Sequence, residues 1–209
     1  MALNINGTTG ISGVDGSVSA PAVTGTDSNT GITFPSADTI KLSTGGVERM
    51  SITNSGVSSP GHILQLVSTY STTHISTTSQ SYVDSGISAT ITPSSTSNKI
   101  FIQSTFNVGA SEVQTVYFKL YNGSSEITAA TNGNSGNGSA FTAGINHASG
   151  AQFDIGQIGH NFLYTSNTTS ATTIKVYWRC DGGTAYINRY GYSTSVGGGS
   201  CLTLLEVAG

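Results

Sequence analysis

Side chains that could perform acid–base or nucleophilic chemistry are sparse in this sequence. Glycoside hydrolysis needs two carboxyl groups held about 5 to 10 Å apart. The spacing of the carboxylates gives no reason to bring any two together; those we considered are Glu112, Glu126, Asp154, Asp181 and Glu206. Serine and threonine are abundant, but their number alone cannot identify a nucleophile, because a hydroxyl needs a neighbouring base to activate it. We therefore predict no catalytic residue and no enzymatic activity.

The four histidines do not form a metal-binding motif. His62, His74, His147 and His160 contain no HxH or HxxxH pair, and such short spacings are what usually seed a metal site. We predict no metal ligand within one chain. A single histidine on a threefold axis would occur three times and could hold an ion, and that alternative stays open.

The cysteines and the glycine-rich stretches do not indicate redox or nucleotide chemistry. Cys180 and Cys201 are too few for a disulfide framework and are not spaced as CxxC. We expect both to be small buried or half-buried residues. Residues 197–199 (GGG) precede a predicted strand rather than a helix, so they indicate a turn and not a phosphate-binding loop. No cofactor is expected.

The best candidates for a contact surface are aromatic and amide side chains. Tyrosine rings with polar ends, beside an arginine fork, can bind sugars or protein edges with little loss of conformational entropy. The chain offers these at Tyr186, Arg189, Tyr190 and Tyr192. Strand alternation predicts that Tyr186 and Tyr190 share one face and that Arg189 points to the other. The glycine-rich residues 131–139 predict a long exposed loop, with candidate contact residues Asn132, Asn134 and Asn137.

The low charge of the chain excludes several classes of partner. Seven Lys and Arg against ten Asp and Glu give a net charge of −3, and only 8% of the residues are charged. A basic face for nucleic acid is therefore excluded. Apolar residues make up 36% of the chain, too many for a disordered polymer. We expect no membrane insertion and no signal peptide, since no apolar run approaches the roughly 18 to 20 residues of a span.

The elements that must position these side chains are predicted to be strands, because apolar residues recur with a period of two along much of the chain. Apolar residues alternate with polar ones over residues 99–108, 116–121 and 174–178, which predicts half-buried strands. Asn122-Gly123 predicts a hairpin, and residues 184–190 and 201–207 predict two more strands. Trp178 is expected in the core. We predict an all-β chain in which residues 60–209 form a jelly-roll-like β-sandwich.

The first 59 residues differ from the rest of the chain in composition and apolar pattern, and we predict that they form a separate domain. Short apolar pairs are separated by Gly, Asn, Asp or Pro turns, with no Trp or Tyr and one Phe. Such a segment buries too little apolar area for a core of its own. We predict an interwoven β segment that acquires its interior from identical copies of the chain. The expected trimerisation residues are Ile32, Phe34, Ile40, Leu42, Met50 and Ile52.

Residues 27–56 contain a series of short segments separated by turns. These segments are DSNTGITF (27–34), SADTI (36–40), STGGVERMSI (43–52) and NSG (54–56), and NGTTGISG (6–13) has the same character. This part resembles a module of the tail fibres and related virion proteins of bacteriophages, especially marine and cyanobacterial phages. The later part is similar to globular domains attached to that module, at HILQ (62–65), ITPSSTSNKI (91–100) and LTLLE (202–206). The resemblance covers most of the chain, and residues 27–56 are its most specific part.

This resemblance implies a β-rich homotrimer on the surface of a phage particle, made in the cytoplasm of the host bacterium. The first hypothesis is a short tail fibre or spike that attaches to a host-surface glycan or protein. The second is a capsid-decorating protein on the phage head. A third, enzymatic, hypothesis is a polysaccharide depolymerase. The expected partners are sister copies and other virion proteins.

Overall fold

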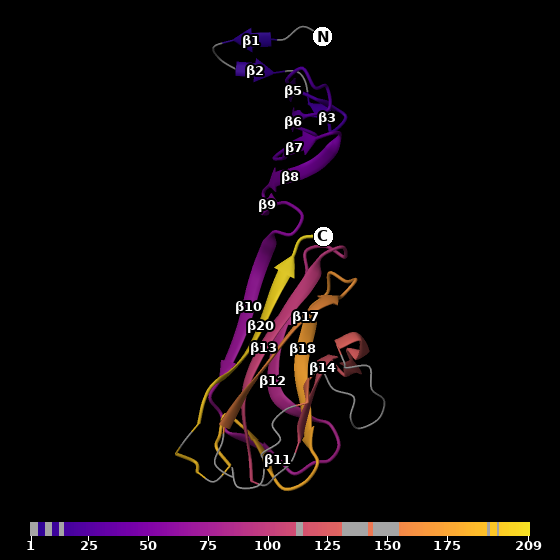
Figure 1. Cartoon of the computed structure of the whole chain (residues 1–209). Coiled ribbons are helices and arrows are strands. Elements are labelled where there is room, and N and C mark those ends of the chain that lie inside the picture. Colours follow the sequence, from indigo (N-terminus) through magenta and orange to yellow (C-terminus); the bar gives the residue numbers. More distant parts are fainter. Residues whose placement is uncertain are drawn as a thin grey trace. The chain divides into compact units, whose positions relative to one another are not determined.

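The computed structural model describes residues 4–6, 10–12, 15–111, 115–130, 142–143, 155–191, 193–195 and 197–209. This part of the chain is all-β, as predicted, with one short 3₁₀ turn, η1 (Thr128–Ala130). The chain divides into two compact units (Figure 1). Unit 1 comprises Met1–His62 with Ala208–Gly209, and unit 2 comprises Ile63–Val207.

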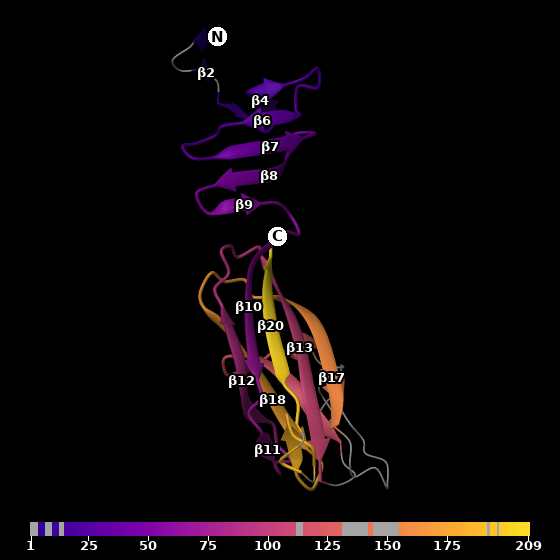
Figure 2. The same ribbon diagram turned by 90° about the vertical axis from the view of Figure 1, so that its left-hand side faces the viewer.

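Unit 1 is built around a meander of short antiparallel strands. Its main sheet has the order β5-β6-β7-β8-β9, and β1-β2 and β3-β4 form two small hairpins (Figure 2). Gly45 and Gly46 form the turn from β7 to β8, both with positive φ (59° and 74°), as the type I′ turn of a two-residue hairpin loop requires. The strands are β1 (Asn4–Asn6), β2 (Gly10–Ser12), β3 (Gly16–Ser17), β4 (Ala20–Pro21), β5 (Val23–Thr24), β6 (Gly31–Thr33), β7 (Ile40–Thr44), β8 (Val47–Thr53) and β9 (Gly56–Ser58).

The described part of unit 2 forms two antiparallel sheets, an arrangement consistent with a β-sandwich. The first sheet has the order β10-β20-β13-β19-β11 with β17 paired to β13, and the second has β12-β18-β14-β15 with β16 paired to β14. The strands are β10 (Ile63–Ser71), β11 (Ile75–Thr77), β12 (Val83–Ile91), β13 (Lys99–Ala110), β14 (Val116–Asn122), β15 (Ser125–Glu126), β16 (Thr142–Ala143), β17 (Ile155–Thr165), β18 (Thr172–Cys180), β19 (Ala185–Ile187) and β20 (Ser200–Val207).

One hydrophobic core fills the space between the two sheets of unit 2. The inward residues predicted from alternation on β13, β14 and β18 are buried, and Trp178 is 1% exposed. Three aromatic rings stack at the centre: Phe106 on Phe118 with centroids 5.2 Å apart, and Phe118 on Trp178 at 6.3 Å. The predicted hairpin at Asn122-Gly123 is confirmed, since Asn122 pairs with Ser125.

Two local predictions for unit 2 need correction. The strand expected over residues 184–190 is only β19 (Ala185–Ile187), because Asn188 adopts a positive φ of 62° that ends the extended backbone. Lys119 lies on the outward side of β14, as alternation predicts, and yet it is buried. Its ammonium is held by the Glu126 carboxylate at 2.8 Å, which compensates the charge.

Candidate functional site

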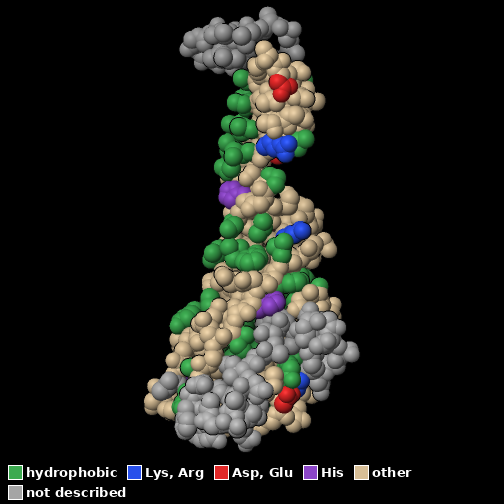
Figure 3. Space-filling view, in the orientation of Figure 1, with side chains coloured by type: hydrophobic (Ala, Val, Ile, Leu, Met, Phe, Trp, Pro, Cys, Tyr) green, Lys and Arg blue, Asp and Glu red, His purple; other side chains and the backbone are tan. Residues whose placement is uncertain are grey.

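One face of the unit 1 sheet, here called the apolar face, carries large hydrophobic side chains. Directly paired residues in antiparallel strands point to the same side, and the register places Val23, Ile32, Leu42 and Met50 in one row. A second row contains Ile40, Ile52 and Val57. Phe34 adjoins Ile40 and Ile52 around a shallow pocket of about 400 Å³. Figure 3 shows hydrophobic atoms along one side of unit 1.

These side chains are exposed to an extent that is unusual for their type. Among the rows and Phe34, all except the half-buried Ile32 are between 36% and 52% exposed. Within residues 15–62, no Val, Ile, Leu, Met or Phe side chain is buried, whereas Thr33 and Ser43 are. The prediction that this segment has no core of its own is therefore confirmed for its described residues.

The opposite face of the same sheet is polar. Lys41 alternates with Ile40 and Leu42 along β7, and its ammonium lies 2.6 Å from the Glu48 carboxylate. The sheet is thus amphipathic, with charged side chains on one face and the hydrophobic rows on the other. All six residues expected at the trimer contact, Ile32, Phe34, Ile40, Leu42, Met50 and Ile52, lie on the apolar face or beside its pocket. Their role in trimerisation stays a prediction.

A second hydrophobic feature, here called the outer apolar row, crosses the first sheet of unit 2 on the side away from the core. Leu66 of β10 pairs with Leu205 of β20, Leu205 with Phe101 of β13, and Phe101 with Leu163 of β17. Leu66 is 61% exposed and Leu163 is 47% exposed. Sequence analysis missed this row. Its signal was present, since Phe101, Leu163 and Leu205 each break the alternation by following another apolar residue.

The outward face of the second sheet carries a ladder of tyrosines and charges. Cross-strand pairs between β14 and β18 are Tyr117 with Arg179, Lys119 with Tyr177, and Tyr121 with Lys175. The Arg179 guanidinium carbon lies 3.9 Å from the centroid of the Tyr117 ring. All three cations bind carboxylates: Arg179 binds Asp181 at 2.7 Å, Lys119 binds Glu126 and Lys175 binds Asp84. The charges of this ladder are therefore compensated within the sheet.

The candidate contact residues near β19 lie differently from the prediction. The Arg189 guanidinium carbon lies 4.2 Å from the centroid of the Tyr186 ring, so the two side chains lie together. The prediction that Arg189 points away from Tyr186 is wrong, because β19 ends at Ile187 and the positive φ of Asn188 redirects the chain. Tyr190 is half-buried beyond the strand. Tyr192, Asn132, Asn134 and Asn137 lie outside the described residues.

Asn188 fixes the position of Arg189. It is fully buried, and its side-chain amide donates to the backbone oxygens of Ser71 and Thr73 at 2.8 and 3.1 Å. The Ser200 hydroxyl donates to its Oδ1 at 2.5 Å. These contacts tie the end of β19 to the β10–β11 connection and to the start of β20. A residue that nothing in the sequence singled out thus holds the candidate surface in place.

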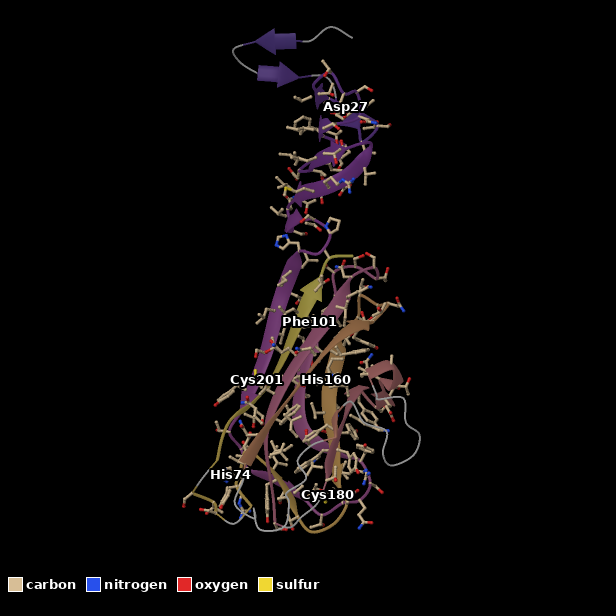
Figure 4. The ribbon with its side chains drawn as sticks, in the orientation of Figure 1. Asp27, His74, Phe101, His160, Cys180 and Cys201 are labelled. Atoms are coloured by element: carbon tan, nitrogen blue, oxygen red, sulfur yellow. The ribbon has the colours of Figure 1, made fainter. Side chains whose placement is uncertain are left out.

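Several titratable groups among the described residues are held in ion pairs or hydrogen bonds or are partly buried. Among the carboxylates considered above, Glu126 and Asp181 form ion pairs, and Glu206 is hydrogen-bonded; Glu112 and Asp154 lie outside the described residues. Burial lowers the pKa of His160 and raises that of the Cys180 thiol, which disfavours the charged form of each. Figure 4 marks both residues in unit 2.

The Glu206 carboxylate accepts four hydrogen bonds within the described part of unit 2. The residue is 1% exposed, and it accepts hydrogen bonds from Gln65 and from Asn98 at 2.6 Å each, and from the backbone N–H and hydroxyl of Ser94. Burial alone would raise the pKa of Glu206, but these donors outweigh it, so the pKa lies below its ordinary value. The group therefore acts as a buried clamp between β10, β20 and the loop before β13.

The described residues offer no metal-binding cluster, and the sequence has no match among known families. Within the described ranges, no group of three or more His, Cys, Asp or Glu could hold a metal ion, and both cysteines are free thiols. No helix in this part of the structure is long and apolar enough to cross a membrane. The sequence matches no protein-family model and no curated protein.

Proposed function

We propose that this protein is a non-enzymatic structural protein of a bacteriophage virion, a short trimeric tail fibre or spike that contributes to host attachment. The observation that carries the proposal is the apolar face of unit 1. Contiguous exposed hydrophobic surface of this kind marks an interaction site. The phage context comes from the resemblance of residues 27–56 to a tail-fibre module, and these residues provide all of this face except Val23 and Val57.

Sister copies are the occupant that best fits the apolar face. Covering the seven side chains that are between 36% and 52% exposed, together with the half-buried Ile32, would contribute on the order of 10 kcal/mol per chain. This is comparable to the free-energy cost of association. Three copies related by a threefold axis would turn the hydrophobic rows inward and leave Lys41 and Glu48 in water. A single-layer sheet would thereby gain the interior that one chain cannot provide.

The outer apolar row supports self-association through unit 2 as well. Four large side chains, Leu66, Leu205, Phe101 and Leu163, lie side by side on four strands. The outward face of the second sheet carries the tyrosine–charge ladder instead. This asymmetry favours an oligomer in which the first sheet of each unit 2 faces its neighbours.

We also propose that unit 2 is a jelly roll. Eight of its strands pair in a nested order: β10 with β20, β12 with β18, β13 with β17, and β14 with β16. The first of these strands pairs with the last, the second with the seventh, and so on inward. That order is expected when one long antiparallel hairpin wraps into two sheets, which is how a jelly roll is built.

Sedimentation of the full-length protein tests the proposal. We expect a species with three times the mass of one chain at micromolar concentration. A folded monomer at high dilution, with the amide protons of β7 and β8 protected from exchange, would contradict it, because the apolar face would then be stable in water.

Localisation on the particle separates the two virion roles. A few trimers at the tail, seen by labelling with antibody, would support the fibre. Many copies over the head would instead support a capsid-decorating protein, for which the low charge of the chain, 8% of residues, is suited because close-packed copies repel little.

A further inference from the structure

Arg189 and Lys99 are the two described cations of unit 2 that form no ion pair with a described carboxylate, and of these Arg189 is half-buried whereas Lys99 is exposed. All four carboxylates that the structure describes in this unit are engaged: Asp84 with Lys175, Glu126 with Lys119, Asp181 with Arg179, and Glu206 with its hydrogen-bond donors. No carboxylate among the described residues lies within ion-pair distance of Arg189. Within the described residues the charge of Arg189 is therefore uncompensated, in a chain that has only seven Lys and Arg.

The local geometry presents this cation for binding. The guanidinium packs against the Tyr186 ring at 4.2 Å, which fixes its plane. Its Nε is buried and has no hydrogen-bond partner in the described part of the structure. A guanidinium that has lost water at one edge and has no anion beside it is unfavourable. An anionic group bound at the guanidinium would relieve that cost.

Aromatic and polar side chains surround the same spot. The backbone of Arg189 pairs with that of Gly197 in an isolated antiparallel β-bridge. The His74 imidazole also approaches this glycine, because its Nε2 lies 3.0 Å from where a Cβ on Gly197 would stand. The Tyr70 ring packs directly on Gly199 and is 68% exposed as a residue. The glycine segment 197–199 thus lies against Tyr70, His74 and Arg189 at one end of unit 2, where Figure 4 marks His74.

We propose that this cluster binds a carboxylate-bearing saccharide. The guanidinium fork matches a carboxylate, and the exposed Tyr70 ring offers a face for the C–H side of a sugar ring. One cation beside aromatic rings fits one carboxylate per sugar, whereas an acidic peptide would require several cations. The inference rests on the proposed attachment role, because it names the class of host glycan that the protein would contact.

Calorimetric titration of the full-length protein with trigalacturonate, and separately with a sialic acid trimer, tests the inference. We expect at least one to bind at millimolar concentration or below, and neutral galactotriose to bind at least about tenfold more weakly. Arg189→Gln should weaken binding of the acidic sugar about tenfold or more, and Arg189→Lys should restore it only in part because the fork is lost. The matched control is Arg49→Gln, an exposed arginine of unit 1, which should bind like the unmodified protein.

Several results would overturn the inference. These are no heat from either acidic sugar, equal affinity for the neutral one, unchanged binding by Arg189→Gln, or an equal loss in Arg49→Gln. If inorganic phosphate displaced the sugar at equal concentration, the cluster would be a general anion site and the saccharide assignment would be wrong. The sedimentation mass of the same samples separates the two proposals: a trimer that ignores acidic sugars contradicts only this inference, and a monomer that binds them contradicts only the trimer.

Discussion

Unit 1 and unit 2 are both made of antiparallel strands, but they treat their hydrophobic side chains in opposite ways. In unit 2, two sheets face each other and bury Phe106, Phe118 and Trp178 almost completely. In unit 1, the five-stranded sheet leaves Val23 and Val57 at 52% and 42% exposure. The buried side chains of its described strands include Thr33 and Ser43, which are polar.

The difference shows that strand formation and core formation are separate requirements. Alternating residues and glycine turns are enough to specify the meander of unit 1. A sheet with a hydrophobic face still needs a second layer, and unit 2 provides one from its own sequence while unit 1 does not. If the missing layer is another copy of the chain, the stability of unit 1 depends on protein concentration and that of unit 2 does not.

The largest effect should come from the core of unit 2. Trp178→Ala should lower the free energy of unfolding of unit 2 by about 3 to 5 kcal/mol, because a fully buried ring would leave a cavity. Denaturant unfolding followed by circular dichroism measures this. Phe34→Ala removes an exposed ring from unit 1 and should change the same transition by less than about 0.5 kcal/mol. Equal effects of the two substitutions would remove the distinction between the units.

Substitutions on the apolar face of unit 1 should weaken self-association of the chain and leave the folding of unit 2 unchanged. Ile32→Ser with Phe34→Ser should weaken assembly by roughly 2 kcal/mol per chain, given the area that remains exposed in one chain. Sedimentation over a dilution series measures the shift, and the unfolding transition of unit 2 should stay in place. Thr24→Ser with Thr53→Ser, at exposed polar positions of the same unit, is the control. Loss of unit 2 structure with no change in mass would contradict the assignment.

Glu206 should make the stability of unit 2 depend on acid. Its folded-state pKa lies below the ordinary 4.5. The ionised carboxylate therefore stabilises unit 2 above pH 4.5, and this contribution is lost as the pH falls through the folded-state pKa. Glu206→Gln should cost about 2 kcal/mol at neutral pH, since hydrogen bonds to a charged acceptor are replaced by weaker ones.

The acid limb of the stability profile is the fall in the free energy of unfolding of unit 2 as the pH is lowered. Glu206→Gln should make this fall shallower. Denaturant unfolding between pH 7 and pH 3 compares Glu206→Gln with Glu48→Gln, which alters a carboxylate of unit 1. The profile of unit 2 should keep its acid limb in the second variant. An identical limb in both would show that the buried clamp is not its source.

The smallest effect should come from the ion pair of unit 1, and the buried ion pair of unit 2 should differ from it. Lys41 and Glu48 are 31% and 38% exposed in their side chains, so Lys41→Met should cost less than about 0.5 kcal/mol. The side chain of Lys119 is 9% exposed, and its removal would leave the half-buried Glu126 carboxylate without a counter-charge. Lys119→Met should therefore cost more, about 1 to 3 kcal/mol. Thermal unfolding at low and high salt measures both. Equal costs would mean that burial does not distinguish the pairs.

Much of the fold followed from the sequence, and the candidate site followed only in part. Alternation placed Ile102, Phe118 and Trp178 in the core, and the scarcity of large residues in the first 59 residues anticipated the absence of a core there. The same alternation rule failed at Arg189, because a single residue, Asn188, leaves the extended conformation. It also hid the outer apolar row, since a row across four strands depends on register between segments far apart in the chain.

The sequence by itself determined where strands form and which of their faces avoid water. Those properties are local, because they depend on neighbours one or two residues away. Only the tertiary structure decided which strands pair, so that Leu66 meets Leu205 and Arg189 packs on Tyr186. Pairing depends on contacts between distant segments and on the burial of groups such as Asn188 and Glu206, whose hydrogen-bond partners are supplied by other strands and loops.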